Sequence, residues 1–130
     1  MLPNEQNLDV AVKGGGHSAA GASSTHGGLL IDRDGMKRVE VDSDTRLLQI
    51  QGGALLSDID DAAWERQLAN VGSAVADTGV GGLTLGGSYG HPSGQRGLGI
   101  DNLVSATVAM ADGSIEKASQ DENEVSYWAI

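Results

Sequence analysis

The chain has 130 residues, 39% of them hydrophobic, which is the composition of one globular domain that can bury about 65–70% of its unfolded surface. Eight Lys and Arg residues against 18 Asp and Glu residues give a net charge of −10, which argues against a nucleic-acid partner because phosphate binding needs a basic face. The absence of cysteine excludes disulfides, thiolate metal sites and cysteine nucleophiles.

The first half of the chain predicts four short strands and one helix. The strands are expected at residues 9–13, 28–32, 38–42 and 46–51. Residues 55–69 predict a helix, because apolar residues recur there at three- and four-residue spacings. Acidic residues cover the opposite side of this segment, and we interpret them as the solvated face of the helix rather than as a metal site.

In the second half, a short strand is predicted at residues 73–76 and a longer one at 102–111. Asp112-Gly113 predicts a two-residue hairpin turn, because both central positions of such a turn favour positive φ, and residues 114–118 return from it. A last helix is expected from residues 121–124 through Trp128. Strands and helices that do not alternate regularly predict an α+β fold.

Glycine makes up 20 of the 130 residues and is concentrated in two clusters. Gly14-Gly15-Gly16 follows a predicted strand and can expose successive backbone N–H groups to an anion such as a pyrophosphate. Nine further glycines lie between Gly79 and Gly99. They either form tight turns only or lay the backbone flat against a large ligand.

The common nucleotide, hydrolase and metal motifs fit poorly. The spacing Gly14-x-Gly16-x-x-Ala19 matches the dinucleotide fingerprint, but no amphipathic helix follows it, which argues against a Rossmann fold. The P-loop pattern is absent, and without G-x-S-x-G a serine hydrolase is unsupported. The three histidines lack the paired spacing of a zinc site, so we expect no metal.

Four sequence blocks occur in order, at residues 14–18, 78–87, 97–103 and 111–113. In this order and at these separations they resemble the FAD-binding domain of flavin-linked oxidases of the vanillyl-alcohol oxidase / p-cresol methylhydroxylase type, within it the berberine-bridge-enzyme-like branch. The resemblance runs from about Asp9 to Ile130. It implies that residues 1–130 form a PCMH-type FAD-binding domain of two small α/β subdomains, truncated at both ends.

The resemblance implies FAD as the cofactor and assigns residues to it. The first block matches the loop around the pyrophosphate, and the second matches the segment along the isoalloxazine and the adjoining phosphates. The implied cofactor-binding residues are Gly14, Gly15, Gly16, His17, Ser18, Gly79, Val80, Gly81, Gly82, Leu83 and Tyr89.

His17 matches the histidine that commonly carries the flavin covalently in this branch, through the 8α-methyl of the isoalloxazine. Its imidazole is nucleophilic at either nitrogen when neutral; the alternative is a histidine that only hydrogen-bonds the loop. A second link through cysteine is excluded, because the matching position is about Val75. We expect His26 on a surface loop, while His91 either has a loop role or lines the cofactor cleft.

The implied function is that of a flavin-dependent oxidoreductase, with hydride transfer from an alcohol-type or similar donor to FAD and O₂ as the acceptor. Members of the family carry a further strand and helix before residue 9 and a substrate-binding domain after this segment. We therefore expect the small-molecule substrate to be bound by a missing domain, and no catalytic residue is assignable here. The alternatives are a truncated, non-catalytic FAD-binding remnant or binding module, and an acidic structural domain without a ligand.

The N-terminus gives no targeting signal. Met1–Glu5 has no basic or apolar region of a signal peptide, and no apolar run approaches the ~20 residues of a membrane span. A cytoplasmic protein without a membrane partner is the default expectation.

Overall fold

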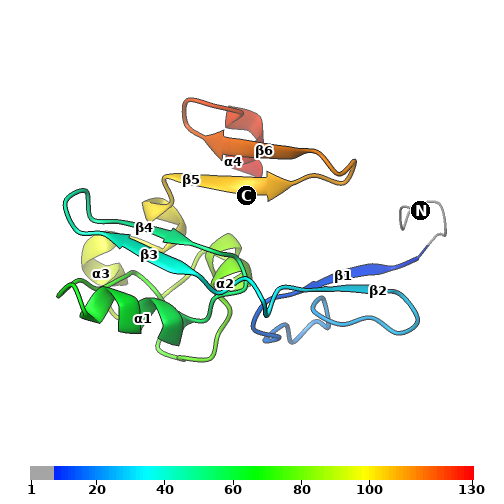
Figure 1. The fold of residues 1–130 in the computed structure, drawn as a ribbon, viewed down its shortest axis with the longest axis horizontal. Helices are drawn as coiled ribbons and strands as arrows, with labels where there is room; N and C mark the ends of the chain where they lie inside the picture. Colours follow the sequence, from blue (N-terminus) through cyan, green and yellow to red (C-terminus); the bar gives the residue numbers. More distant parts are fainter. Residues whose placement is uncertain (1–7) are drawn as a thin grey trace.

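The computed structural model describes residues 8–130, and within them it contains three two-stranded sheets (Figure 1). The first pair is parallel and the other two are antiparallel. In chain order the pairs are β1 (Val10–Lys13) with β2 (Leu29–Asp32), β3 (Val39–Asp42) with β4 (Leu47–Ile50), and β5 (Ser105–Ala109) with β6 (Ile115–Ser119). Six of the seven predicted strands are therefore confirmed, and the mixture of small sheets and helices is an α+β arrangement.

Helix α1 (Leu56–Trp64) packs on β3 and supplies the largest fully buried side chains, those of Leu56 and Ile59. The Asp58 carboxylate accepts the backbone N–H of Leu55 at 2.8 Å and so satisfies one of the free donors at the helix start. The helix is shorter than the predicted 55–69. It ends because Gln67 adopts a left-handed conformation with φ of 56°, and the chain then turns away.

The prediction for residues 73–76 is wrong, because this segment is a loop and not a strand. Three short helical segments follow it, namely α2 (Val80–Leu85), α3 (Ser93–Arg96) and a 3₁₀ turn at Ile100–Asn102. The 3₁₀ turn makes β5 begin at Ser105 rather than at residue 102. The last predicted helix is confirmed as α4 (Glu124–Ala129).

The predicted two-residue turn at Asp112-Gly113 is also wrong. Met110 N–H bonds the carbonyl of Ser114 at 2.8 Å, so three residues form the loop between β5 and β6. Only Gly113 has a positive φ, of 86°, which is the pattern of a three-residue hairpin with a left-handed last residue. The Asp112 carboxylate instead accepts the Ser114 backbone N–H and hydroxyl.

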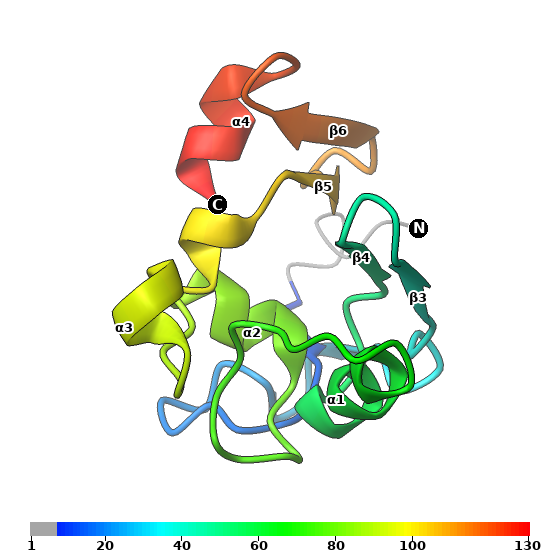
Figure 2. The same ribbon diagram turned by 90° about the vertical axis from the view of Figure 1, so that its left-hand side faces the viewer.

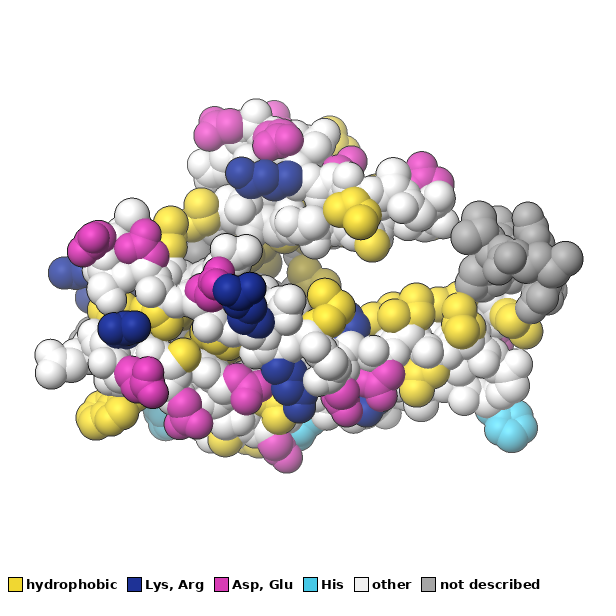
Figure 3. Space-filling view, viewed as in Figure 1, with side chains coloured by type: hydrophobic (Ala, Val, Ile, Leu, Met, Phe, Trp, Pro, Cys, Tyr) yellow, Lys and Arg dark blue, Asp and Glu magenta, His cyan; other side chains and the backbone are white. Residues whose placement is uncertain are grey.

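In both ribbon views α1 lies below β3 and β4, while β5, β6 and α4 lie above them (Figures 1 and 2). Strands β1 and β2 extend to one side as an arm, along which hydrophobic side chains gather (Figure 3). The chain exposes 9150 Å², against the roughly 6,400 Å² of a compact 13.3 kDa protein. The expected burial of 65–70% is therefore not reached. Large hydrophobic side chains are exposed on the arm, such as those of Val12 and Ile31, and elsewhere, such as those of Trp64 and Trp128.

Among residues 8–130, no helix combines the length and the hydropathy that crossing a membrane requires. The absence of a signal peptide was predicted from residues 1–5, which lie outside the described residues.

Ser88 is the one polar side chain buried among the described residues, at 4% exposure. Its hydroxyl donates to the carbonyl of Val71 at 3.1 Å and ties the end of the second glycine cluster to the loop before it. Ser88→Ala should lower the free energy of unfolding by about 1 kcal/mol, the net value of such a hydrogen bond. Urea unfolding measures this free energy. As a control, Ser43→Ala replaces an exposed residue in the β3–β4 turn and should change the free energy of unfolding by less than about 0.5 kcal/mol. Equal effects of the two substitutions would contradict the assigned role.

Candidate functional site

The first glycine loop begins where β1 ends. Gly14 and Gly15 are partly buried, and Gly16 has a φ of 76°, a conformation that glycine adopts without strain. His17 and Ser18 follow on the surface. The Ser18 hydroxyl oxygen accepts the backbone N–H of Ala22 at 3.1 Å, so this side chain holds the loop's own turn.

The second glycine cluster is anchored on the residues that precede α1. Gly79 is buried and forms an isolated antiparallel bridge with Leu55. The N–H of Val80 bonds the carbonyl of Ala54 at 2.9 Å, and α2 starts at this point. The first residues of the cluster are therefore fixed by contacts from a distant part of the chain.

The two glycine loops touch each other through their backbones. A Cβ atom on Gly15 would lie 2.3 Å from the backbone nitrogen of Gly79, and one on Gly79 would lie 2.2 Å from the nitrogen of Gly15. No side chain fits at either position without a shift of the other loop. The structure therefore brings together the two segments that the family resemblance assigns to one cofactor.

Gly82 has open space at its Cβ position, in contrast to Gly15 and Gly79. A Cβ atom there would meet no atom within 4 Å, its φ is not in the left-handed region, and the residue is exposed on α2. No packing or conformational reason within the described chain therefore requires glycine inside this helix, where it costs about 1 kcal/mol relative to alanine. An open glycine beside the junction of the loops leaves room for a flat ligand to approach the backbone.

His17 faces a carboxylate from the second loop region. Its Nε2 lies 3.3 Å from Oδ1 of Asp77, and the two side chains are 43% and 74% exposed. A proton on Nε2 would face this carboxylate, and Nδ1 would then be the nitrogen with the free electron pair. Asp77 was missed from the sequence, although its position two residues before Gly79 is a signal that could have been used.

Two basic residues near the first loop, Lys13 and Arg33, differ in whether a carboxylate pairs with them. Lys13 Nζ lies 2.9 Å from a carboxylate oxygen of Asp32 and 3.2 Å from one of Asp34. The hydrogen bond to Asp32 is the main cause that raises the pKa of Lys13, and the same bond lowers the pKa of Asp32. Arg33, between these two aspartates in sequence, has a buried Nε without a hydrogen-bond partner among the described residues. An unsatisfied buried guanidinium nitrogen beside the loops fits a site for an anionic group.

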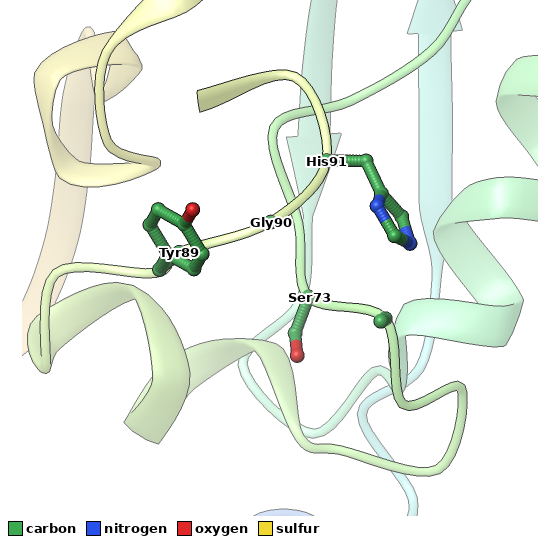
Figure 4. A pocket seen from close by; sticks show the side chains of 5 residues that line it. Ser73, Tyr89, Gly90 and His91 are labelled. Carbon is green, nitrogen blue, oxygen red and sulfur yellow. The ribbon is translucent and has the colours of Figure 1, made fainter. Parts of the chain in front are cut away.

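Tyr89 and His91 line a pocket of about 300 Å³, together with Ser73, Ala74 and Gly90. Their side chains leave the chain on either side of Gly90 (Figure 4). Tyr89 is 76% exposed. His26 lies on an exposed loop between β1 and β2, as expected. Within residues 8–130, His, Cys, Asp and Glu side chains form no group of three that could hold a metal.

Comparisons with known proteins all match this chain to FAD-dependent proteins. The family profile described as "FAD binding domain" matches residues 2–119. The FAD-linked oxidoreductase pgmH of Aspergillus terreus is 46% identical over 128 residues, which are 98% of this chain and 26% of that protein.

Two solved structures have the same fold. The 6-hydroxy-D-nicotine oxidase of Arthrobacter nicotinovorans superposes with a TM-score of 0.94 at 30% identity, over 98% of this chain and 28% of its own. Glucooligosaccharide oxidase from Acremonium strictum, described with a 6-S-cysteinyl, 8α-N1-histidyl FAD, gives a TM-score of 0.83 at 38% identity, over 98% and 27%. The chain thus spans about a quarter of the length of these relatives.

Proposed function

The chain belongs to the family of FAD-binding domains of FAD-linked oxidoreductases, and from that premise we propose that it holds one FAD at the junction of its two glycine loops. The pyrophosphate is assigned to Gly14–Ser18 and the isoalloxazine to Gly79–Leu83. The direct contact between Gly15 and Gly79 carries this proposal, because it makes one site out of two distant segments. Successive backbone N–H groups in the first loop supply donors for phosphate oxygens.

The bound flavin supplies hydride acceptance, and the chain supplies its binding and orientation. We propose that the protein oxidises an alcohol-type or similar donor and passes the electrons to O₂. The name of glucooligosaccharide oxidase supports an alcohol-type donor, and the names of this relative and of 6-hydroxy-D-nicotine oxidase both support O₂ as the acceptor. No residue of the described chain is assigned as the acid or base of that reaction.

His17 is proposed as the covalent attachment point, through Nδ1. The position of Asp77 beside Nε2 supports Nδ1 as the reacting nitrogen, and N1, the same nitrogen, carries FAD in glucooligosaccharide oxidase. Attachment would join this nitrogen to the flavin 8α carbon. One hydrogen would be lost from the imidazole and one from the methyl group, and O₂ would take up both as hydrogen peroxide.

Titration of FAD into the apoprotein tests the proposed function. Saturable quenching of flavin fluorescence at one FAD per chain is the expected result. No quenching and no thermal shift at high micromolar FAD would overturn the proposal in favour of a structural domain without this ligand.

Gly82→Ala should weaken FAD binding without destabilising the apoprotein. Alanine is the better helix former, so the apoprotein should keep its free energy of unfolding or gain up to about 1 kcal/mol. A methyl group in the open space beside the proposed isoalloxazine segment should weaken FAD binding about tenfold or more, as a steric loss of 1.4 kcal/mol does. Thermal unfolding and FAD titration measure the two effects.

Gly94→Ala is the matched control for Gly82→Ala, since Gly94 also lies in a short helix with open space around it. It should leave the FAD dissociation constant unchanged. If Gly82→Ala also left that constant unchanged, the proposed placement of FAD along α2 would be wrong.

A further inference from the structure

Arg33 lies where the two glycine loops and a third turn converge. The residue follows β2, and its side chain reaches back across Gly14, Gly52 and Gly81. Cβ atoms built on Gly14 and Gly81 would lie 3.5 and 2.8 Å from one terminal guanidinium nitrogen, and a Cβ on Gly52 would lie 2.5 Å from the other. The guanidinium is thus packed against one glycine of each proposed cofactor loop.

The charge on Arg33 has no counter-ion in the described part of the chain. Its Nε is buried without a hydrogen-bond partner, and no carboxylate lies within ion-pair distance of the guanidinium among residues 8–130. The two flanking carboxylates, Asp32 and Asp34, are engaged by Lys13 instead. A guanidinium that is partly desolvated and unpaired destabilises the fold unless a ligand supplies the missing charge.

An unpaired guanidinium at this position favours a ligand with phosphate groups. A guanidinium presents a fixed fork of donors that matches phosphate oxygens, and its charge persists at every physiological pH. The chain carries a net charge of −10, which opposes binding of a phosphate-bearing cofactor unless a local cation offsets it. Arg33 is the described cation that contacts both glycine loops.

We infer that Arg33 is a binding residue for the pyrophosphate of FAD and supplies its counter-charge at the junction of the loops. This inference rests on the proposed FAD site. It goes beyond the assignment of glycine backbones alone, because it adds a charged side chain that lies outside both glycine blocks. A Cβ at Gly52 or Gly81, neither of which has a positive φ, would displace the guanidinium from its present position.

The test compares FAD with riboflavin, which has the same isoalloxazine and no phosphate. Arg33→Leu should raise the FAD dissociation constant about ten- to a hundredfold, the value of hydrogen bonds to a charged group. Riboflavin binding, measured by competition, should change less than about twofold. The salt dependence of FAD binding should become shallower, because one charge contact is lost.

The thermal midpoint of the apoprotein distinguishes a binding role of Arg33 from a purely structural one. Removing an unpaired, partly buried charge should leave the thermal midpoint of the apoprotein unchanged or raise it, while FAD binding weakens. Arg33→Gln gives a neutral polar variant if Arg33→Leu does not fold. Arg33→Lys keeps the charge but loses the fork of donors, so it should weaken FAD binding less than Arg33→Leu does. Arg66→Leu removes an exposed charge outside both loops and should leave FAD binding unchanged.

Three results would overturn the inference: unchanged FAD binding in Arg33→Leu and Arg33→Gln, equal weakening of FAD and riboflavin, or equal weakening by Arg66→Leu. If the wild-type chain binds neither flavin, the proposed function itself fails. If the wild-type chain binds FAD and the Arg33 variants bind it equally well, only the role of Arg33 fails.

Discussion

Gly15→Ala should abolish FAD binding and destabilise the chain by about 2–3 kcal/mol, the cost of overpacking a closely packed site. The physical reason is the crossing of the two loops. A Cβ on Gly15 would lie 2.3 Å from the nitrogen and 2.8 Å from the Cα of Gly79, so backbone rather than a flexible side chain must move. Chemical denaturation and FAD titration measure the two losses.

Gly35→Ala provides the matched control for this substitution. Gly35 has no atom within 4 Å of its Cβ position and no positive φ. Its replacement should change the free energy of unfolding by less than about 0.5 kcal/mol and leave FAD binding intact. If Gly15→Ala were tolerated as well as Gly35→Ala, the contact between the loops would not be a requirement of the site.

His17→Ala should eliminate covalently bound flavin, so that acid precipitation releases all of the cofactor into the supernatant. The wild-type chain, assembled with FAD in air, should retain flavin in the pellet. Trypsin cuts after Lys13 and Arg33, so the expected peptide contains both His17 and His26. Fragmentation of that peptide must therefore place the added mass on His17.

Two further variants make this result specific. His26→Ala should retain the acid-stable flavin, since His26 lies on an exposed loop outside the proposed site. Asp77→Asn should slow the attachment, because the amide no longer favours the tautomer with a free Nδ1. Acid-stable flavin in His17→Ala, or an adduct on another peptide, would refute the assignment of His17.

The strands were predictable because their signals are local. Val39 and Val41 alternate with polar neighbours, and β3 forms there with β4 as its antiparallel partner. Helix α2 was missed for the opposite reason. Two of its six residues are glycine, and it is positioned by the bond from Val80 to Ala54 and by the contact of Gly79 with Gly15, neither of which local propensity encodes.

The candidate site also contains residues that could be predicted from the sequence and residues that could not. The glycine blocks could be assigned because they match the motifs of a known family, whereas the glycine content alone left tight turns and ligand contact as alternatives. Asp77 had one signal, its position two residues before Gly79, whereas Arg33 had none, because its environment comes from distant segments. Arg33 meets Gly52 and Gly81 only after the turn before α1 and the start of α2 are brought beside β2.

Hydrogen–deuterium exchange of the chain with and without FAD tests the central claim most directly, because it locates the cofactor without any substitution. FAD should slow amide exchange in the peptides that cover Gly14–Ser18 and Gly79–Leu83 together, with the same dependence on FAD concentration. The β5–β6 hairpin should be unaffected. Protection of only one loop, or protection confined to other segments, would contradict a single FAD site at the junction of the two glycine loops.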